Sequence, residues 1–241
     1  MPPPFHILAR KEDIAERVIV AGDPARVEQL ATMLEGAKLV NTNRHLLVYT
    51  GYYKGVPLTV ATHGIGGPSA TIVFEELRML GAKLMIRLGT AGALKPEINI
   101  GDFIVASGAA YLCNSNSIGM YVPGYCMPTA PSPDVTVALI EEASRQGEKV
   151  IVAPVFSSDA FYAENPNFAK EWSEKGIAAV EMECASLFAL GWMKGFKTGA
   201  LLMISDSLVG NKEEFLTAKE LAPRVEKASR IVFETAIKVK V

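Results

Sequence analysis

Several short clusters of polar residues follow apolar runs in this sequence of 241 residues, and their side chains are of the types that bind anions or move protons. The first cluster, Gly22-Asp23-Pro24-Ala25-Arg26, comes directly after the apolar run 18–21. A glycine at the end of a strand, followed by a proline that opens a helix, presents backbone N–H groups to an anion. Arg26 would lie one turn into that helix. The alternative is a tight turn that carries a surface arginine.

Arg87 stands inside the apolar run 84–88, and we expect this strand to break at Gly89-Thr90-Ala91-Gly92. A buried arginine destabilises a protein unless its guanidinium meets an anion or a carboxylate. Thr90 adds a hydroxyl and backbone N–H groups beside it. The residues therefore predict an anion site at Arg87, with a structural pair between Arg87 and a core carboxylate as the alternative.

Two further clusters carry carboxylates. Val180-Glu181-Met182-Glu183 precedes a helical pattern that begins near Cys184, and Ser205-Asp206 follows the apolar run 199–204. Alternation along an extended segment puts Glu181 and Glu183 on one side, unless a bend at the start of the helix separates them. A carboxylate at this place either partners the helix dipole or accepts two hydrogen bonds from a diol.

Short buried strands and amphipathic helices must position these clusters. Runs rich in Val and Ile that are apolar on both faces predict strands covered on both sides, at 17–21, 58–61, 84–88, 103–106, 150–155, 178–180 and 199–204. Helical periods predict helices over 68–81, from Cys184 onward and over 221–239, with Pro223 marking the start of the last one. The runs 46–51 and 56–62 predict a hairpin, and 111–132 is loop-like.

Strands that alternate with helices predict an α/β fold: one domain over residues 1–241, with a central mixed, mostly parallel twisted sheet flanked by helices. Gly22, Thr90, Glu183 and Asp206 then fall at the carboxyl ends of strands, which is where open α/β sheets bind ligands. The four clusters are therefore expected to meet in one site.

Composition excludes several classes of protein. Hydrophobic residues make up 49% and charged residues 21% of the chain, which predicts a globular core rather than disorder. The formal net charge of -2 leaves no basic surplus for nucleic acid or an anionic membrane. Three cysteines in no metal-ligand spacing predict free thiols, no metal site and a reducing cytoplasm, with a disulfide between Cys113 and Cys126 as the less favoured alternative. The sequence has no apolar stretch that would serve as a signal sequence or a membrane span.

Six motifs, taken in order, resemble those of the type I nucleoside phosphorylases. They are Gly22-Asp23-Pro24-x-Arg26, Thr62-His63-Gly64-Ile65-Gly66, Arg87-x-Gly89-Thr90-x-Gly92, Phe156-Ser157-Ser158-Asp159-x-Phe161-Tyr162, Val180-Glu181-Met182-Glu183 and Ser205-Asp206. The resemblance runs from His6 into the last helix, and it is greatest to the hexameric purine nucleoside phosphorylases and the archaeal 5'-methylthioadenosine phosphorylases. It implies that inorganic phosphate attacks the anomeric carbon of a ribose and releases the base and ribose 1-phosphate.

The resemblance also implies roles for individual residues. Phosphate would be bound by Gly22, Arg26, Arg87 and Thr90, and by Arg44 of a neighbouring subunit. Phosphate is a co-substrate, and no cofactor is expected. The ribose would be bound by Ile65, Met182 and Glu183, and by His6 of an adjacent subunit. The base would be bound by Ala91, Gly92, Phe161, Val180, Glu181, Ser205 and Asp206. Arg87 and Asp206 would be catalytic, Asp206 as the acid that protonates purine N7, in a homohexamer whose subunits share sites.

Other functions stay open at this point. Uridine phosphorylases share the pattern but carry Gln-x-Arg where this chain has Asn165 and Asn167, which disfavours uracil. Hydrolytic nucleosidases use water and lack the arginine set, and a non-catalytic nucleoside-binding module would need no acid. Related purine phosphorylases pair their aspartate with a downstream arginine, whereas 217–221 contains none, which leaves Lys219 or Arg224 as substitutes.

Overall fold

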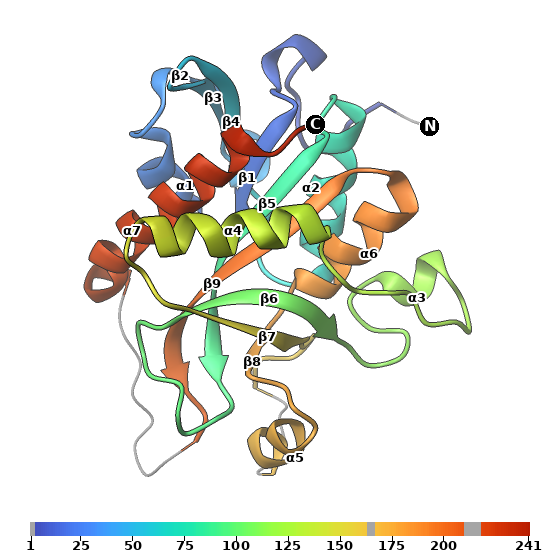
Figure 1. Ribbon diagram of the computed structural model, residues 1–241. Coiled ribbons are helices and arrows are strands. Elements are labelled where there is room, and N and C mark those ends of the chain that lie inside the picture. The colour runs from blue at the N-terminus through green and yellow to red at the C-terminus, as the bar shows by residue number, and fades with distance from the viewer. Residues whose placement is uncertain (1–2, 163–166, 210–217) are drawn as a thin grey trace.

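Nine strands in the described part of the chain form one sheet (Figure 1). The computed structural model describes residues 3–162, 167–209 and 218–241. The strands are β1 (Arg17–Ala21), β2 (Glu35–Asn41), β3 (Val48–Tyr53), β4 (Val56–Thr62), β5 (Leu84–Ala93), β6 (Phe103–Ala110), β7 (Val150–Ser157), β8 (Ala179–Glu181) and β9 (Lys197–Ser207). Each predicted strand run overlaps one of them, and β3 and β4 form the predicted hairpin.

The order of strands in the sheet is β2-β3-β4-β1-β5-β8-β7-β6-β9, and β5 also pairs with β9. This extra pairing closes β5, β8, β7, β6 and β9 into a ring, from which β1, β4, β3 and β2 extend as an open sheet. β1 is parallel to β4 and β5, and β5 is parallel to β9, whereas β3 is antiparallel to both of its neighbours. The predicted α/β fold with a mixed sheet is therefore confirmed.

Helices cover both faces of this sheet. They are α1 (Pro24–Ala31), α2 (Gly67–Met79), α3 (Ile118–Tyr121), α4 (Pro133–Arg145), α5 (Phe168–Glu174), α6 (Cys184–Lys194) and α7 (Ala218–Lys238). α2 and α6 pack together on one face, and α1, α4 and α7 cover the other (Figure 1). Two 3₁₀ turns, Lys11–Asp13 and Asn43–His45, precede β1 and β3.

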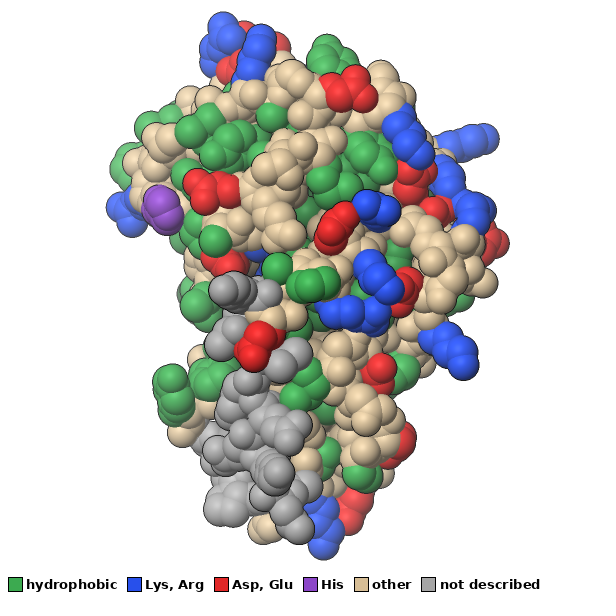
Figure 2. Space-filling view, turned by 90° about the vertical axis from the view of Figure 1, so that its left-hand side faces the viewer, with side chains coloured by type: hydrophobic (Ala, Val, Ile, Leu, Met, Phe, Trp, Pro, Cys, Tyr) green, Lys and Arg blue, Asp and Glu red, His purple; other side chains and the backbone are tan. Residues whose placement is uncertain are grey.

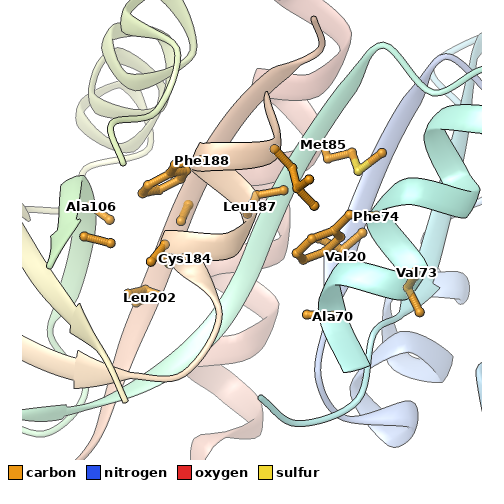
Figure 3. Close-up of a cluster of buried hydrophobic side chains, with 14 of the residues drawn as sticks. Val20, Ala70, Val73, Phe74, Met85, Ala106, Cys184, Leu187, Phe188 and Leu202 are labelled. Carbon is orange, nitrogen blue, oxygen red and sulfur yellow. The ribbon is translucent and has the colours of Figure 1, made fainter. Parts of the chain in front are cut away.

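An apolar layer holds α2 and α6 to the sheet. Figure 3 shows Phe74 of α2 beside Val20 of β1 and Met85 of β5, with Leu187 and Phe188 projecting from α6. All five side chains have no exposed surface. Because burial of one side chain of this size contributes about 1.5–3 kcal/mol, the layer fixes the first turns of α2 and α6 relative to the ends of the strands.

The structure differs from the prediction at the ends of three elements. β5 does not break at Gly89, because β9 pairs with it as far as Ala93. Asp206 lies inside β9 rather than after it, for the same reason. Pro223 lies inside α7 rather than at its start, where it removes one backbone donor from the helix.

Four elements have no counterpart among the predicted ones: β2, α3, α4 and α5. α3 is a single helical turn within 111–132, which the sequence predicted to be loop-like. β2 is exposed along most of its length, so it has no apolar run that would have indicated a strand. α4 buries Val135, Leu139 and Ala143, which share one face of a helix. That spacing was a readable signal, whereas β2 is held by its pairing with β3.

The surface carries charges of both signs. On the face shown in Figure 2, basic and acidic side chains are interspersed rather than separated. Cys113 and Cys126 are exposed free thiols and Cys184 is a buried one, so the cysteines are free as predicted. Within the described residues, no helix is both long enough and apolar enough to cross a bilayer.

Candidate active site

The turn after β1 brings Gly22 and the first turn of α1 to the end of the sheet. Asp23 caps α1, because its carboxylate accepts a hydrogen bond from the Ala25 N–H at 2.9 Å. Arg26 follows and is half-buried. Burial and the positive charge of Arg87 lower the pKa of Arg26. Arg26 and Arg87, which are far apart in the sequence, therefore lie close enough to interact.

A second turn, from β4 into α2, lies beside the first. The His63 N–H donates to the Ala21 carbonyl at 2.9 Å, which joins the ends of β4 and β1. The Ser69 hydroxyl donates to the His63 carbonyl at 2.7 Å and fixes the turn to α2. Ile65, predicted to contact a ribose, is 77% exposed here, so its side chain is accessible to a ligand.

Arg87 of β5 is buried, and its guanidinium contacts Glu181, Glu183 and His63. Its Nη2 lies 2.5 Å from Glu183 Oε2 and 3.2 Å from Glu181 Oε2, and its Nε donates to Glu181 Oε2 at 3.3 Å. Its Nη1 lies 3.1 Å from His63 Nε2. The alternative considered for Arg87, a structural pair with a core carboxylate, is therefore present. One of its two carboxylate partners, Glu183, is the residue predicted to bind a ribose.

The charges in this cluster stabilise one another. Burial by itself would lower the pKa of Arg87, but the carboxylates of Glu183 and Glu181 outweigh it and raise that pKa above its ordinary value. Burial raises the pKa of Glu183, and the charge of Arg87 opposes the rise. Two carboxylates and Arg87 together carry one negative charge, which the nearby Arg26 balances. A buried cluster of this kind is stable only while every charge keeps its partner.

Glu181 and Glu183 do different work at the junction of β8 and α6. Glu181 accepts hydrogen bonds from the backbone N–H of Glu183 at 2.8 Å and of Cys184 at 2.9 Å, and from the Ser157 hydroxyl. These contacts use its carboxylate to hold the start of α6, and the contact with a base that the resemblance implied for Glu181 stays a prediction. The chain bends at Glu183, where α6 starts, as the sequence allowed.

Glu183 keeps acceptor positions that Glu181 does not. Its Oε1 accepts the Gly66 N–H at 2.6 Å and its Oε2 contacts Arg87. Because an ionised carboxylate has about four lone-pair positions, two remain for hydroxyl donors. Met182, the preceding residue, is half-buried beside it.

Val180, Gly92 and Asp206 lie in one row across β8, β5 and β9. A Cβ atom on Gly92 would lie 2.7 Å from Asp206 Oδ2, so this close approach requires a glycine. The Ser205 hydroxyl donates to Asp206 Oδ1 at 2.7 Å. Burial raises the pKa of Asp206, and the hydrogen bond from Ser205 opposes the rise only in part. Asp206 is therefore a carboxyl group that holds its proton to a higher pH than an exposed one.

Arg224 is not the partner of Asp206 that the sequence allowed. Its Nε donates to the Gly101 carbonyl at 2.8 Å, its Nη1 donates to Glu148 at 2.9 Å, and its guanidinium lies 3.9 Å from the centroid of the Phe103 ring. Those contacts occupy its guanidinium, and within the described residues it makes no hydrogen bond or ion pair with Asp206. The side chain of Lys219, the other substitute, lies outside the described residues.

Phe161 lies in the segment after β7 and is 59% exposed. Its ring meets that of Tyr162 edge to face, with the centroids 5.0 Å apart. The segment is anchored by Asp159, whose carboxylate accepts the backbone N–H of Asn116 at 2.9 Å and the side-chain N–H of Asn116 at 3.0 Å. The loop that carries Phe161 is thereby tied to the long segment 111–132.

His6 and Arg44, two of the remaining predicted site residues, lie near each other. The Asn43 side-chain amide donates to the His6 carbonyl at 3.0 Å, so Arg44, which is exposed, is next to the His6 segment. His6 Nδ1 lies 2.8 Å from Glu76 Oε1. In the described part of the chain, neither Arg44 nor His6 joins the Arg87 cluster through a hydrogen bond or an ion pair. Their place in a neighbour's site stays a prediction.

The other predicted site residues lie on or next to strands β1, β5 and β9. Thr90 and Ser205 are half-buried on β5 and β9, Ala91 is buried on β5, and Gly22 is half-buried at the end of β1. Their predicted contacts with phosphate and base stay predictions. Thr90 and Ala91 lie on β5 with Arg87, and Ser205 lies on β9 with Asp206, whereas Gly22 follows β1, which pairs with β5.

Sequence reasoning missed three residues that contact a predicted site residue or the segment that carries one: His63, Glu76 and Asn116. His63 belongs to the motif Thr62-His63-Gly64-Ile65-Gly66, but no role was assigned to it from the sequence. A histidine between a buried strand and two glycines was a signal of a functional position. Glu76 is 7% exposed and accepts the backbone N–H groups of residues 5–7, and its place on the apolar face of the predicted helix 68–81 was also readable. Asn116 lies in a loop with no periodic pattern, so no local signal could have found it.

A groove of about 500 Å³ lies elsewhere, between α4 and α7. Its carboxylates are paired with its own cations: Glu142 contacts Arg145 and Lys238, and Glu234 contacts Lys54. Among the described residues, every charged side chain that lines this groove has an ion-pair partner, so none is free to recognise a ligand.

The chain is similar over nearly its whole length to proteins of one family. A family profile described as Phosphorylase superfamily matches residues 16–238. A guanosine phosphorylase of Halorubrum lacusprofundi is 34% identical, over 94% of this chain and 95% of its own. A DeoD-type purine nucleoside phosphorylase of a Geobacillus species is 36% identical, over 98% and 99%, and a uridine phosphorylase of Thermococcus kodakarensis is 32% identical, over 95% and 87%. Among solved structures, a purine nucleoside phosphorylase from Toxoplasma gondii in complex with immucillin-H matches with a TM-score of 0.88 and 30% identity, over 98% of this chain and 96% of that one.

Proposed function

Because this chain belongs to the phosphorylase superfamily and is a nucleoside phosphorylase, we propose that its substrates are purine ribonucleosides and deoxyribonucleosides. A phosphate oxygen attacks C1' of the sugar, the N-glycosidic bond breaks with its electron pair going to the base, and the products are the free base and the pentose 1-phosphate. The observation that carries the proposal is the contact of 2.5 Å between Arg87 and Glu183. It sets a cation suited to phosphate beside a carboxylate suited to the sugar hydroxyls.

Phosphate binds at the ends of β1 and β5. Arg87 and Arg26 supply positive charge, and Thr90 and the backbone at Gly22 supply further donors. A planar guanidinium grips a phosphate in two places and so fixes the direction of the attacking oxygen. Such positioning removes several kcal/mol from the barrier. Phosphate is a co-substrate, and the reaction needs no cofactor.

The ribose binds against Glu183. The two free acceptor positions of its carboxylate take the 2' and 3' hydroxyls, and Met182 and Ile65 pack against the sugar. The negative charge of Glu183 also stabilises the positive charge that develops on the ring as the glycosidic bond breaks.

The base binds over the row that contains Val180, Gly92 and Asp206. Phe161 stacks on it, and Ala91 and Ser205 line its pocket. Asp206 gives its proton to purine N7, so that the base leaves as a neutral molecule. Its raised pKa supports this role, because an acid must hold its proton near the working pH.

Purines are favoured over uracil because of the segment after Phe161. Asn165 and Asn167 stand where uridine phosphorylases carry Gln and Arg. A site without these two groups leaves the polar edge of uracil unmatched. Asn167 begins the turn into α5, whereas Asn165 lies outside the described residues.

A homohexamer with shared sites accounts for Arg44 and His6. The contact between Asn43 and His6 keeps these two residues on one patch, so one neighbour would deliver both to the same site. Arg44 would complete the phosphate clamp, and His6 would lie near the 5' position of the ribose. Closed assemblies of identical subunits are the usual form of soluble oligomers.

The test compares turnover of inosine, adenosine, guanosine, 5'-methylthioadenosine and uridine, each with and without phosphate. We expect phosphate-dependent release of base from the purine nucleosides and little from uridine. Equal rates without phosphate would indicate a hydrolase, and binding without turnover would indicate a nucleoside-binding module. The order among the purine substrates shows whether the 5' methylthio group is accepted.

The shared site has a separate test. Arg44→Ala and Arg87→Ala subunits are dissociated, mixed and reassembled, and activity is compared with that of each variant alone. Because a shared site takes one arginine from each subunit, some pockets in the mixture regain both arginines. An enzyme that is active as a monomer by sedimentation would contradict the proposal.

A further inference from the structure

His63 lies between β4 and α2 with no exposed surface, and its imidazole contacts the guanidinium of Arg87. The two nitrogens, Nε2 of His63 and Nη1 of Arg87, are 3.1 Å apart. A guanidinium carries only donors, so Nε2 must be the acceptor. The proton of the neutral imidazole then sits on Nδ1, which is buried without a hydrogen-bond partner among the described residues.

Each of the three guanidinium nitrogens of Arg87 has a protein partner. Nε donates to Glu181, Nη2 contacts Glu181 and Glu183, and Nη1 contacts His63. A Cβ atom on Gly89 would lie 2.7 Å from Cζ of Arg87, so the guanidinium plane lies flat against the backbone of its own strand. Nε and Nη1 make hydrogen bonds to Glu181 and His63, whereas Nη2 meets the two carboxylates as an ion pair. The bond to His63 occupies one of the two N–H groups of Nη1.

A neutral acceptor suits this place better than a third carboxylate. Burial and the charge of Arg87 hold the pKa of His63 well below its ordinary range. Imidazole therefore fixes Nη1 without adding negative charge to a cluster that already contains Glu181 and Glu183. A third carboxylate would repel any anion that approaches Arg87.

We propose that His63 is a positioning residue: by accepting one N–H of Arg87 Nη1, it directs the other toward the phosphate. This inference rests on the proposed function, because it takes the anion at Arg87 to be the phosphate that attacks the sugar. His63 touches neither phosphate nor nucleoside, and it acts through the orientation of Arg87 alone.

The test measures the apparent KM for phosphate and for inosine in three variants. His63→Phe keeps an aromatic ring but removes the acceptor, and we expect a rise of about tenfold in the KM for phosphate, which is the effect of losing one hydrogen bond to a charged group. The KM for inosine should stay within about twofold of the wild type, because Glu183 keeps its other partner, Gly66. His63→Gln retains an acceptor oxygen that reaches Arg87, so its KM for phosphate should lie within about threefold of the wild type.

Phe74→Leu is the matched control. The Phe74 ring packs edge to face on His63, with centroids 5.5 Å apart, so this variant loosens the imidazole but keeps its acceptor. We expect a lower Tm and an unchanged KM for phosphate. If His63→Phe does not fold, His63→Asn replaces it, because its amide is too short to reach Arg87.

Three outcomes would overturn the role of His63. They are an unchanged KM for phosphate in folded His63→Phe or His63→Asn, equal losses in His63→Gln and His63→Phe, and a loss of the same size in Phe74→Leu. Titration of phosphate by calorimetry separates this inference from the proposed function. Weaker phosphate binding in His63→Phe supports the role of His63 even if the wild type does not turn over purine nucleosides.

Discussion

The two ends of the site are built in opposite ways. At one end, which we name the arginine end, His63, Arg87, Glu181 and Glu183 are each at most 4% exposed and bound to one another. At the other, the aspartate end, Asp206 is half-buried with Ser205 as its hydrogen-bonding partner, and the Phe161 ring is 59% exposed.

The difference fits what each end would bind under the proposed function. Charges that are buried must be paired before the ligand arrives, and at the arginine end Glu181, Glu183 and His63 already pair with Arg87. The aspartate end has open apolar and acidic groups, and under the proposed function a base would complete their contacts. A different base would then be accommodated at the aspartate end while the arginine end stays the same. This division fits relatives that are named for different nucleosides.

The largest effect should come from Arg87→Ala. Removing the guanidinium leaves Glu181 and Glu183 as unpaired buried carboxylates, which should lower the free energy of unfolding by about 3–5 kcal/mol. Loss of a preorganised group that stabilises charge should also reduce kcat by about 10²–10³. Arg87→Lys separates the two effects, because it keeps the charge but not the planar fork. A folded Arg87→Ala enzyme with unchanged turnover would remove the arginine end from the mechanism.

The next largest effect is expected for Asp206→Ala with inosine or adenosine. General acids contribute about 10²–10⁴ in rate, and we expect the lower end because Asp206 is half-buried and water can replace it in part. With 7-methylguanosine, which is already cationic at N7, most of the turnover should remain. Asp206→Asn should fall between the two. Equal losses for all three nucleosides would mean that Asp206 only positions the base.

The pH dependence of kcat for inosine sharpens this point. Burial raises the pKa of Asp206, so its proton stays on to a higher pH than in an exposed aspartate and is lost as the pH rises through that pKa. The rate for inosine should fall over that range, whereas the rate for 7-methylguanosine should not. In Asp206→Asn the fall should disappear, which identifies the titrating group.

A smaller effect is expected for Phe161→Ala. Stacking of an aromatic side chain on a base is worth about 1–3 kcal/mol, so the KM for the nucleoside should rise by roughly tenfold, with the KM for phosphate unchanged. Because the ring is mostly exposed, the Tm should change little. A rise in the KM for phosphate would show that the two ends of the site are not separable.

For the arginine end, the sequence predicted which residue types would be present but not which side chains would contact one another. Arg87 in an apolar strand predicted a buried charge. The alternative of a core carboxylate partner is present as Glu181 and Glu183, and the anion site stays a prediction. The contact with His63 could not be predicted, because it depends on how the turns after β1 and β4 meet. Long-range pairing of β5 with β9 likewise overrode the local signal for a break at Gly89.

At the aspartate end the sequence was informative about residue types and poor on partners. Ser205 and Asp206 were read from their place beside an apolar run, and the row with Gly92 and Val180 follows from the sheet register. Arg224 looked equally suitable for pairing with Asp206, yet Glu148 and the Gly101 carbonyl hold it elsewhere. Spacing in the sequence does not show which of several acidic partners an arginine will meet.

The smallest effect, and the sharpest probe of the comparison, is expected for Asp159→Asn. The carboxylate of Asp159 accepts two N–H groups of Asn116, and this link holds the segment that carries Phe161. An amide keeps one acceptor oxygen but loses the charge, so the link weakens without breaking. The KM for the nucleoside should rise by about threefold, since about 0.6 kcal/mol is involved, while the KM for phosphate stays constant. His63→Phe should show the reverse pattern, and the two variants together measure whether phosphate and base are positioned by separate sets of residues. If Asp159→Asn instead raised the KM for phosphate, the loop of Phe161 and the Arg87 cluster would have to move as one unit.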